Sequence, residues 1–280
     1  MKKTIFATLA LSMLVSCSEE NPEARALLNS AQQAFDNKEY MLANELLDSL
    51  QGGLYASALN VQRESMLLRP QVIEQLAIIK MAVVDSMTVV DEADMTRLKP
   101  ALKWIKAPEM IEGYWIDAKA YKPNFMNSTG IEARVSEIGQ FYIVSSANPS
   151  SLKHTSITLS TGSASATTQE VPYDGDSNYR IGGGEVITFT PEQSDTIGFF
   201  ASEQLKNATP AMSLSFNGAK GKKTIKLTAA QAKGIATAYE YSKALVRARD
   251  NQVERQRLER TIEIAKNQQE VARQKLEEDK

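Results

Sequence analysis

The last 53 residues of the chain, from Thr228 to Lys280, contain no proline and a single glycine, Gly234. Thr228 and Gln231 have the spacing of a capping box, which marks the start of a helix. A continuous helix of this length spans about 80 Å at 1.5 Å per residue. Its distal part has a seam, a narrow stripe of residues at heptad spacing that includes small and polar side chains: Leu258, Ile262, Ala265, Gln269, Ala272 and Leu276. We expect a partly coiled-coil helix over 228–280 that packs back on the helical region, or projects from it and self-associates.

Residues 17–110 also show apolar residues at helical spacing. Between 22 and 50 the spacing predicts two helices separated by a polar turn at 36–40. The pair resembles one tetratricopeptide hairpin at Ala31, Ala43, Leu47 and Leu50, although Tyr55 stands where that family has a closing proline. The resemblance implies a peptide-binding groove. The alternative is a plain helical pair packed on neighbouring elements, because stable arrays need about three repeats and no second copy is found.

A second long helical pattern follows Gly52 and Gly53. Its stripe repeats in steps of three and four residues: Val61, Ser65, Leu68, Val72, Leu76, Ile79, Val83, Ser86 and Val90. A narrow stripe of this kind predicts a helix that faces one partner helix. Pro70 lies inside the pattern and is expected to kink or restart the helix.

Residues 111–227 have a different character, with most of the aromatic residues and many Ser, Thr and Gly. Short alternating runs predict strands at 114–121, 131–136, 140–147, 156–160, 165–171, 185–190, 195–201, 212–216 and 223–227. Turn signals at 138–139, 160–164 and 217–221 favour hairpins. We therefore predict an α+β fold in which an antiparallel β-sandwich at 111–227 is inserted between the two long helical patterns.

The N-terminus has the features of an export signal. Lys2 and Lys3 precede an apolar run at 5–15, which is too short to remain as a membrane anchor. The residues Leu14, Val15 and Ser16 lead directly into Cys17, and this stretch resembles the lipobox of bacterial lipoproteins. The resemblance implies removal of residues 1–16, acylation of Cys17 with chains such as palmitate, and a lipid-anchored protein of the cell envelope.

Glu19 and Glu20 follow the cysteine and resemble the export signal of surface lipoproteins in the Bacteroidota. That resemblance implies attachment to the outer membrane, and we leave both its periplasmic and its cell-surface face open. Cys17 is the only cysteine, so disulfide bonds do not stabilise the fold. The formal net charge of -2 does not favour nucleic acid, and the arginines at 247–260 alternate with acids as on a solvated helix.

The sequence offers few candidate catalytic residues. His154 is the only histidine, and no hydrolase, zinc-protease, phosphate-loop or dinucleotide motif is present. We interpret His154 as a loop or strand-end residue bonded to the backbone. The protein is therefore not expected to be an enzyme, and a hydrolase that works through scattered acids is the least favoured alternative.

One loop has the spacing of a calcium site. Asp174, Asp176, Asn178 and Glu185 stand at positions one, three, five and twelve of a calcium-loop pattern. Tyr179 occupies the position that needs glycine, and the flanks look like strands. The two interpretations are a Ca²⁺ ligand set, the only cofactor considered, and a polar turn followed by three glycines.

Aromatic residues of the β region suggest a ligand surface. Tyr114, Trp115, Tyr173 and Tyr179, with Tyr121, Phe125 and Tyr142, are candidates for a stacking platform for sugar rings. Core packing or a protein contact is the alternative, because half of the side chains in a strand face inward. From sequence we therefore expect a non-catalytic binding or scaffold protein whose β domain contacts a glycan or protein. The alternative is an assembly subunit that uses its helices to hold another envelope protein.

Overall fold

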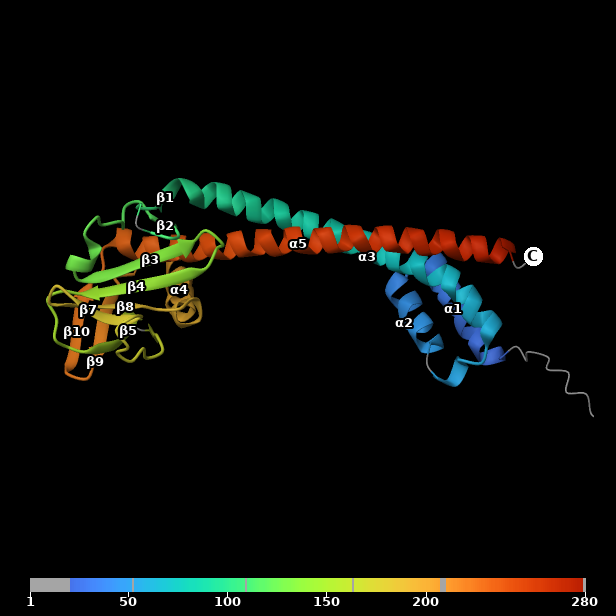
Figure 1. Ribbon diagram of the computed structural model, residues 1–280, viewed down its shortest axis with the longest axis horizontal. Helices are drawn as coiled ribbons and strands as arrows, with labels where there is room; N and C mark the ends of the chain where they lie inside the picture. Colours follow the sequence, from blue (N-terminus) through green and yellow to red (C-terminus); the bar gives the residue numbers. More distant parts are fainter. Residues whose placement is uncertain (1–20, 52, 109, 163, 207–209, 279–280) are drawn as a thin grey trace, which may run out of the picture. The chain divides into compact units, whose positions relative to one another are not determined.

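The computed structural model describes residues 21–51, 53–108, 110–162, 164–206 and 210–278, with the backbone alone at 276 and 278. The predicted signal segment and Cys17 lie outside these residues. The described chain has the predicted α+β fold, with five α-helices and two antiparallel sheets (Figure 1).

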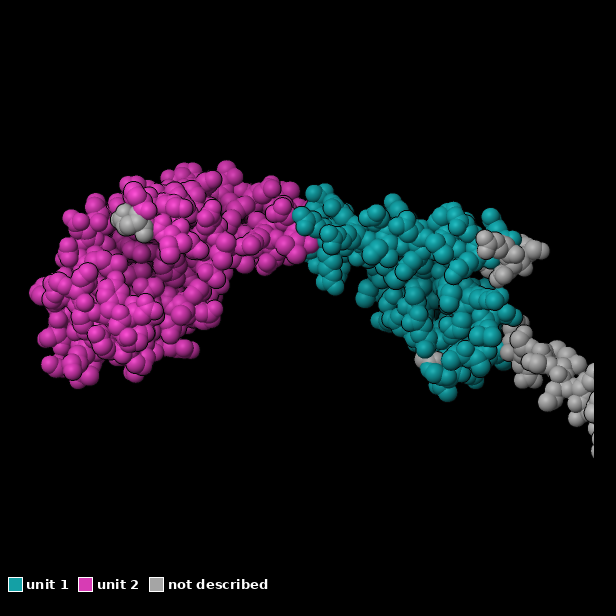
Figure 2. Space-filling view, in the orientation of Figure 1, with its two compact units in different colours: residues 1–84, 254–280 teal, residues 85–253 magenta. Residues whose placement is uncertain are grey.

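The chain divides into two compact units (Figure 2). Unit 1 comprises residues 1–84 and 254–280, and unit 2 comprises residues 85–253. The division falls inside both long helices, α3 (Leu59–Leu98) and α5 (Ala229–Glu278), so each helix contributes to both cores. The boundaries predicted from sequence, 110/111 and 227/228, follow changes in secondary structure instead.

Unit 1 begins with the helical hairpin α1 (Pro22–Asp36) and α2 (Tyr40–Leu50), followed by the 3-10 turn η1 (Gly53–Tyr55). The side chain of Asn21 caps α1 by accepting bonds from the amides of Glu23 and Ala24, both at 3.1 Å. The hairpin packs on the first part of α3 through a core of small and large apolar residues: Ala24, Leu28, Ala31, Ala34, Ala43, Leu47, Leu50, Val61, Leu68 and Val72. The alanines allow the helices to approach closely.

Helix α3 decides between two expected effects of Pro70 and corrects the predicted stripe. It continues through Pro70 as one helix, which excludes a restart there and leaves the expected kink untested. The predicted stripe is buried from Val61 to Val72, but Ile79, Val83 and Val90 are 50%, 54% and 60% exposed. Ala77 and Val84 are buried in their place, where they contact Leu258 of α5. The buried face shifts because α3 changes partner, from the α1–α2 hairpin to α5.

Helix α5 begins with the predicted capping box. The Thr228 hydroxyl accepts a bond from the Gln231 amide at 3.2 Å, and Gln231 Oε1 accepts one from the Thr228 amide at 2.9 Å. The distal seam packs back on α3 within unit 1, with Leu258 and Ala265 buried and Gln269 Nε2 2.6 Å from Glu74 Oε2. The side chain of Leu276 lies outside the described residues.

Unit 2 contains the two sheets. The six-stranded sheet has the order β1-β2-β3-β4-β8-β7 and the four-stranded sheet the order β10-β9-β5-β6. The strands are β1 (Leu102–Ile105), β2 (Tyr114–Asp117), β3 (Gly130–Ser136), β4 (Phe141–Ala147), β5 (His154–Ser160), β6 (Ser165–Thr167), β7 (Asn178–Ile181), β8 (Gly184–Thr188), β9 (Ser213–Gly218) and β10 (Gly221–Lys226). Both sheets contribute to one core, as in a sandwich. Two 3-10 turns, η2 (Lys99–Ala101) and η3 (Phe125–Asn127), connect elements of this unit.

The prediction of a strand at 195–201 was wrong, since this segment lies in helix α4 (Pro191–Leu205). Thr190 and Gln193 form a reciprocal capping box, and Pro191 occupies the first turn. Ser194, Ile197 and Ala201 lie on one buried face, and Ser194 Oγ accepts a bond from the Ile143 amide at 2.9 Å. The structure also adds β1 and β7, which were not predicted.

The first part of α5 belongs to the core of unit 2. Tyr239 packs edge-on against Phe141 with ring centroids 5.3 Å apart, and Ile235 and Tyr241 are buried beside it. Between α3 and α5, the buried carboxylate of Asp91 accepts bonds from Arg247 Nε at 2.7 Å and Asn251 Nδ2 at 3.0 Å. These contacts join the long helices within unit 2 to the sandwich.

Candidate functional site

The predicted calcium loop separates into an exposed turn and a buried pair. Asp174 and Asp176 lie on the exposed turn, where Asp174 Oδ1 accepts bonds from the amides of Asp176 and Asn178, both at 2.9 Å. The Asn178 and Asp176 amides hold the pKa of the Asp174 carboxyl below its usual value. This is the geometry of the polar-turn interpretation.

Glu185 and Asn178 are buried between the sheets and bonded there. Glu185 accepts bonds from the amides of Lys153 at 2.7 Å and His154 at 2.9 Å, while Asn178 Nδ2 donates to the carbonyls of His154 and Val171. Among the described residues, no group of three or more His, Cys, Asp or Glu side chains is placed to hold a metal ion. The structure does not bring the four predicted calcium ligands together.

His154 lies at the centre of this buried network. Its Nδ1 is 2.9 Å from Glu185 Oε2, and its Nε2 is 3.0 Å from the hydroxyl of Ser145. The three residues come from β5, β8 and β4, so the network connects the two sheets. His154 begins β5, in agreement with the predicted strand-end position, but its ring bonds two side chains and not the backbone.

Burial determines the protonation of this network. Desolvation lowers the pKa of His154 despite its bond to Glu185. For Glu185, burial opposes ionisation, but the bonds from His154 and the Lys153 amide leave its pKa below the usual value. A neutral histidine that donates from Nδ1 to a carboxylate and accepts from Ser145 at Nε2 satisfies both ring nitrogens.

The hydrogen bonds connect a serine to a histidine and the histidine to an acid, as in a nucleophilic triad. However, Ser145 and His154 are 0% exposed and Glu185 is 1% exposed, and the Phe216 ring packs edge-on against the imidazole at 5.5 Å. A substrate would have to reach a hydroxyl with no accessible surface. The geometry therefore fits a polar link between two sheets.

The four aromatic residues predicted to bind a ligand have different surroundings. Tyr114 is buried under the Arg134 guanidinium, 4.1 Å from the ring centroid, and burial raises its pKa to about 12. Trp115 packs against Trp104 and Tyr241. Tyr179 is half-buried and packs against a small apolar cluster. Of the four, Tyr173 alone is classed as exposed, at 64%, and the Arg180 guanidinium lies 5.0 Å from its ring centroid. They do not form one stacking platform.

Unit 1 has a ligand-sized surface groove. A groove of about 860 Å³ runs between α2, α3 and the last part of α5. Its apolar lining includes Tyr40, Met41, Leu42, Leu76, Ile79 and Leu258. Three of these have unusually exposed apolar side chains, since Met41, Leu42 and Ile79 are 65%, 45% and 50% exposed. Clusters of exposed apolar side chains on soluble proteins commonly mark binding surfaces.

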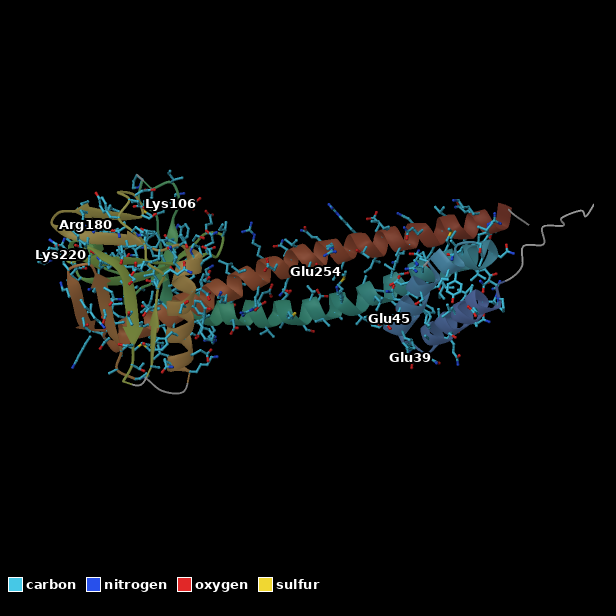
Figure 3. All side chains as sticks on the ribbon, turned by 90° about the horizontal axis from the view of Figure 1, so that it is seen from below. Glu39, Glu45, Lys106, Arg180, Lys220 and Glu254 are labelled. Atoms are coloured by element: carbon cyan, nitrogen blue, oxygen red, sulfur yellow. The ribbon has the colours of Figure 1, made fainter. Side chains whose placement is uncertain are left out.

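Charged residues border this groove. Glu39 and Glu254, both labelled in Figure 3, line it together with Lys38, Lys80 and Arg257. Arg257 and Glu254 pair at 3.6 Å. Within the described part of the chain, Lys38 and Lys80 form no ion pair. The charged residues of the border that form no ion pair with each other are therefore two lysines and one carboxylate, that of Glu39, which gives the border a net positive charge.

The tetratricopeptide resemblance implied a peptide-binding groove at the hairpin but did not identify these lining residues. Ile79 was assigned to the buried stripe of 61–90, and Met41 was not considered. The sequence does contain a signal for the groove: α2 and α3 have more apolar residues than a single packing stripe requires. Met41 and Leu42, for example, are adjacent, so they cannot both lie in one stripe of a helix. A second groove of about 470 Å³ lies between α3 and α5 near Pro70 and Val271.

Comparison with protein-family models, curated proteins and solved structures finds no match to this chain. Among the described residues, no helix is both long enough and apolar enough to cross a membrane.

Proposed function

We propose that this protein is a non-catalytic assembly component of the bacterial cell envelope that binds an amphipathic helix of another protein in the groove of unit 1. The observation that carries the proposal is the open apolar groove between α2, α3 and α5, with Met41, Leu42 and Ile79 exposed at its border. Of the two functions expected from sequence, this observation favours assembly through helices.

The chemistry of the groove supports a helix as its occupant. An amphipathic helix places apolar side chains at i, i+3, i+4 and i+7 on one face, and helix-lined grooves bind such faces. Methionine adapts its shape to different apolar partners. Lys38 and Lys80 favour acidic residues on the flanks of the bound helix. Small apolar molecules are the other occupants that a groove of this volume admits.

The membrane attachment is part of the proposal. Acylation at Cys17, implied by the lipobox resemblance, would tether the chain only a few residues before α1, which begins at Pro22. Several acyl chains inserted together hold a protein much more firmly than one. A tether there would keep the groove of unit 1 close to the membrane.

Site-specific photo-crosslinking tests the proposal. A photoreactive amino acid replaces Leu42 in the full-length lipoprotein, and a matched variant carries it at Ile111, which is 94% exposed in unit 2. We expect position 42, and not position 111, to crosslink one protein through a peptide with apolar residues at helical spacing. Crosslinks only to lipid, only to a second copy of this chain, or equally from both positions would contradict the proposal.

A further inference from the structure

A second surface of the molecule has different chemistry. Strand β10 is at one end of the four-stranded sheet, and among the described strands it pairs only with β9. An end strand leaves backbone N–H and C=O groups along one side without a strand partner. Lys222, Thr224 and Lys226 of this strand are exposed, and Gly221 begins it at the hairpin turn.

The segment that contains β10 is basic throughout. Residues 204–239 contain six lysines and no aspartate or glutamate. Lys220, in the turn before β10, projects from the end of unit 2 (Figure 3). The Lys220 amide donates to the Leu152 carbonyl at 2.9 Å, which holds the turn beside the exposed Lys153. Lysines from two chain segments therefore meet at this end of the sheet.

These lysines have no acidic partners within the described residues. Lys220, Lys222 and Lys226 form no ion pair there, and Lys223 Nζ contacts only neutral oxygens, Thr129 Oγ1 at 3.1 Å and the Pro149 carbonyl at 3.4 Å. The charge is consequently not neutralised by the fold. It is available to an anionic partner that comes alongside the strand.

Lysines on an end strand also prevent pairing between identical strands. Two copies of β10 placed edge to edge would bring like charges together, which is unfavourable. The same arrangement attracts a strand with acidic residues at alternate positions. We propose that the free edge of β10 binds an extended acidic polypeptide segment, which adds to the four-stranded sheet as a further strand.

Backbone pairing separates this proposal from simple attraction between charges. An added strand needs its own N–H groups, whereas a polyanion or an anionic membrane needs only negative charge. The proposal also predicts which residues change. The amides of 221–226 that face the free edge would gain protection from exchange, while the lysine side chains provide orientation and selectivity.

The test uses the full chain and a fluorescent nonapeptide of alternating glutamate and valine. Its control is the same peptide with every backbone nitrogen methylated, which keeps the charge and removes the N–H donors that strand pairing needs. We expect the unmodified peptide to bind and to slow amide exchange at 221–226, and the methylated peptide to do neither. Equal binding of the two peptides would overturn the proposal. So would binding only to vesicles that contain anionic phospholipid, or protection elsewhere alone.

Charge-reversed variants complete the test. Lys222→Glu with Lys226→Glu should weaken binding of the unmodified peptide by about tenfold, since exposed ion pairs contribute modestly each. The matched control, Lys106→Glu with Lys122→Glu, changes two exposed lysines outside β10 and should leave it unchanged. If the first variant does not fold, Lys222→Gln with Lys226→Gln replaces it. An unchanged affinity in a folded β10 variant would contradict the proposal.

Discussion

Nδ1 of His154 lies 2.9 Å from Oε2 of Glu185 in the interior of unit 2, where neither residue is more than 1% exposed. The bond connects β5 of one sheet to β8 of the other. Ser145 of β4 extends the link through the second ring nitrogen. The only histidine of the chain therefore joins the two halves of the sandwich, and its protonation is coupled to folding.

Acidification should destabilise unit 2. The folded-state pKa of His154 lies below its ordinary value of 6.5, so the unfolded state takes up a proton first as the pH falls. The free energy of unfolding should therefore decrease below about pH 6.5, and further below about pH 4.5, where Glu185 also titrates in the unfolded chain. Urea denaturation across this range measures it. His154→Gln should lack the first decrease, and the same decrease in both proteins would contradict the assignment.

Ser145 should not react as a nucleophile. Its hydroxyl has no accessible surface and is bonded to the His154 ring. Incubation of the folded protein with a fluorophosphonate probe should consequently leave it unlabelled. Covalent labelling that disappears in Ser145→Ala would reveal an accessible nucleophile and contradict the non-catalytic proposal.

The role of the groove in partner binding can be tested by introducing one charged residue at its border. Ile79→Asp places a carboxylate at the apolar border of the groove and should reduce crosslinking to the partner by at least about tenfold, the cost of desolvating a charge in an apolar contact. Because Ile79 is 50% exposed, stability should change by less than about 0.5 kcal/mol. Val89→Asp is the matched control, since Val89 is 66% exposed on the same helix in unit 2. Equal losses in both variants would exclude a specific role for the groove.

The proposed lipid anchor has its own test. Cells that make the protein should incorporate labelled palmitate into the wild type and not into Cys17→Ser, because the thiol is the proposed acylation site. Mass spectrometry should find the mature chain beginning at Cys17. An unmodified thiol, or cleavage at another residue, would remove the basis for the envelope location.

Long-range packing explains where prediction from sequence succeeded and failed. The capping box at Thr228 and the absence of proline are local signals, and they were sufficient to predict α5. The stripe of α3 was predicted correctly only as far as Val72, because a helix that changes partners carries two apolar faces and periodicity does not assign them. Ile79 and Val83 were consequently assigned to the buried stripe of α3, although both are exposed.

Other differences have local causes. The strand predicted at 195–201 followed the apolar run, although Thr190, Pro191 and Gln193 are ordinary signals for the start of a helix. The link between Ser145, His154 and Glu185 had no such signal. These residues are separated by 9 and 31 positions and meet only through the pairing and stacking of strands.

The most direct test of the proposed function is amide hydrogen exchange of the full chain with the partner segment identified by crosslinking, supplied as a synthetic peptide. If that segment binds as an amphipathic helix in the groove, exchange should slow at 38–44, 73–80 and 254–261, which line it. The same regions should be unaffected by the peptide in Ile79→Asp. Binding without protection of these three regions would place the partner elsewhere and contradict the proposal.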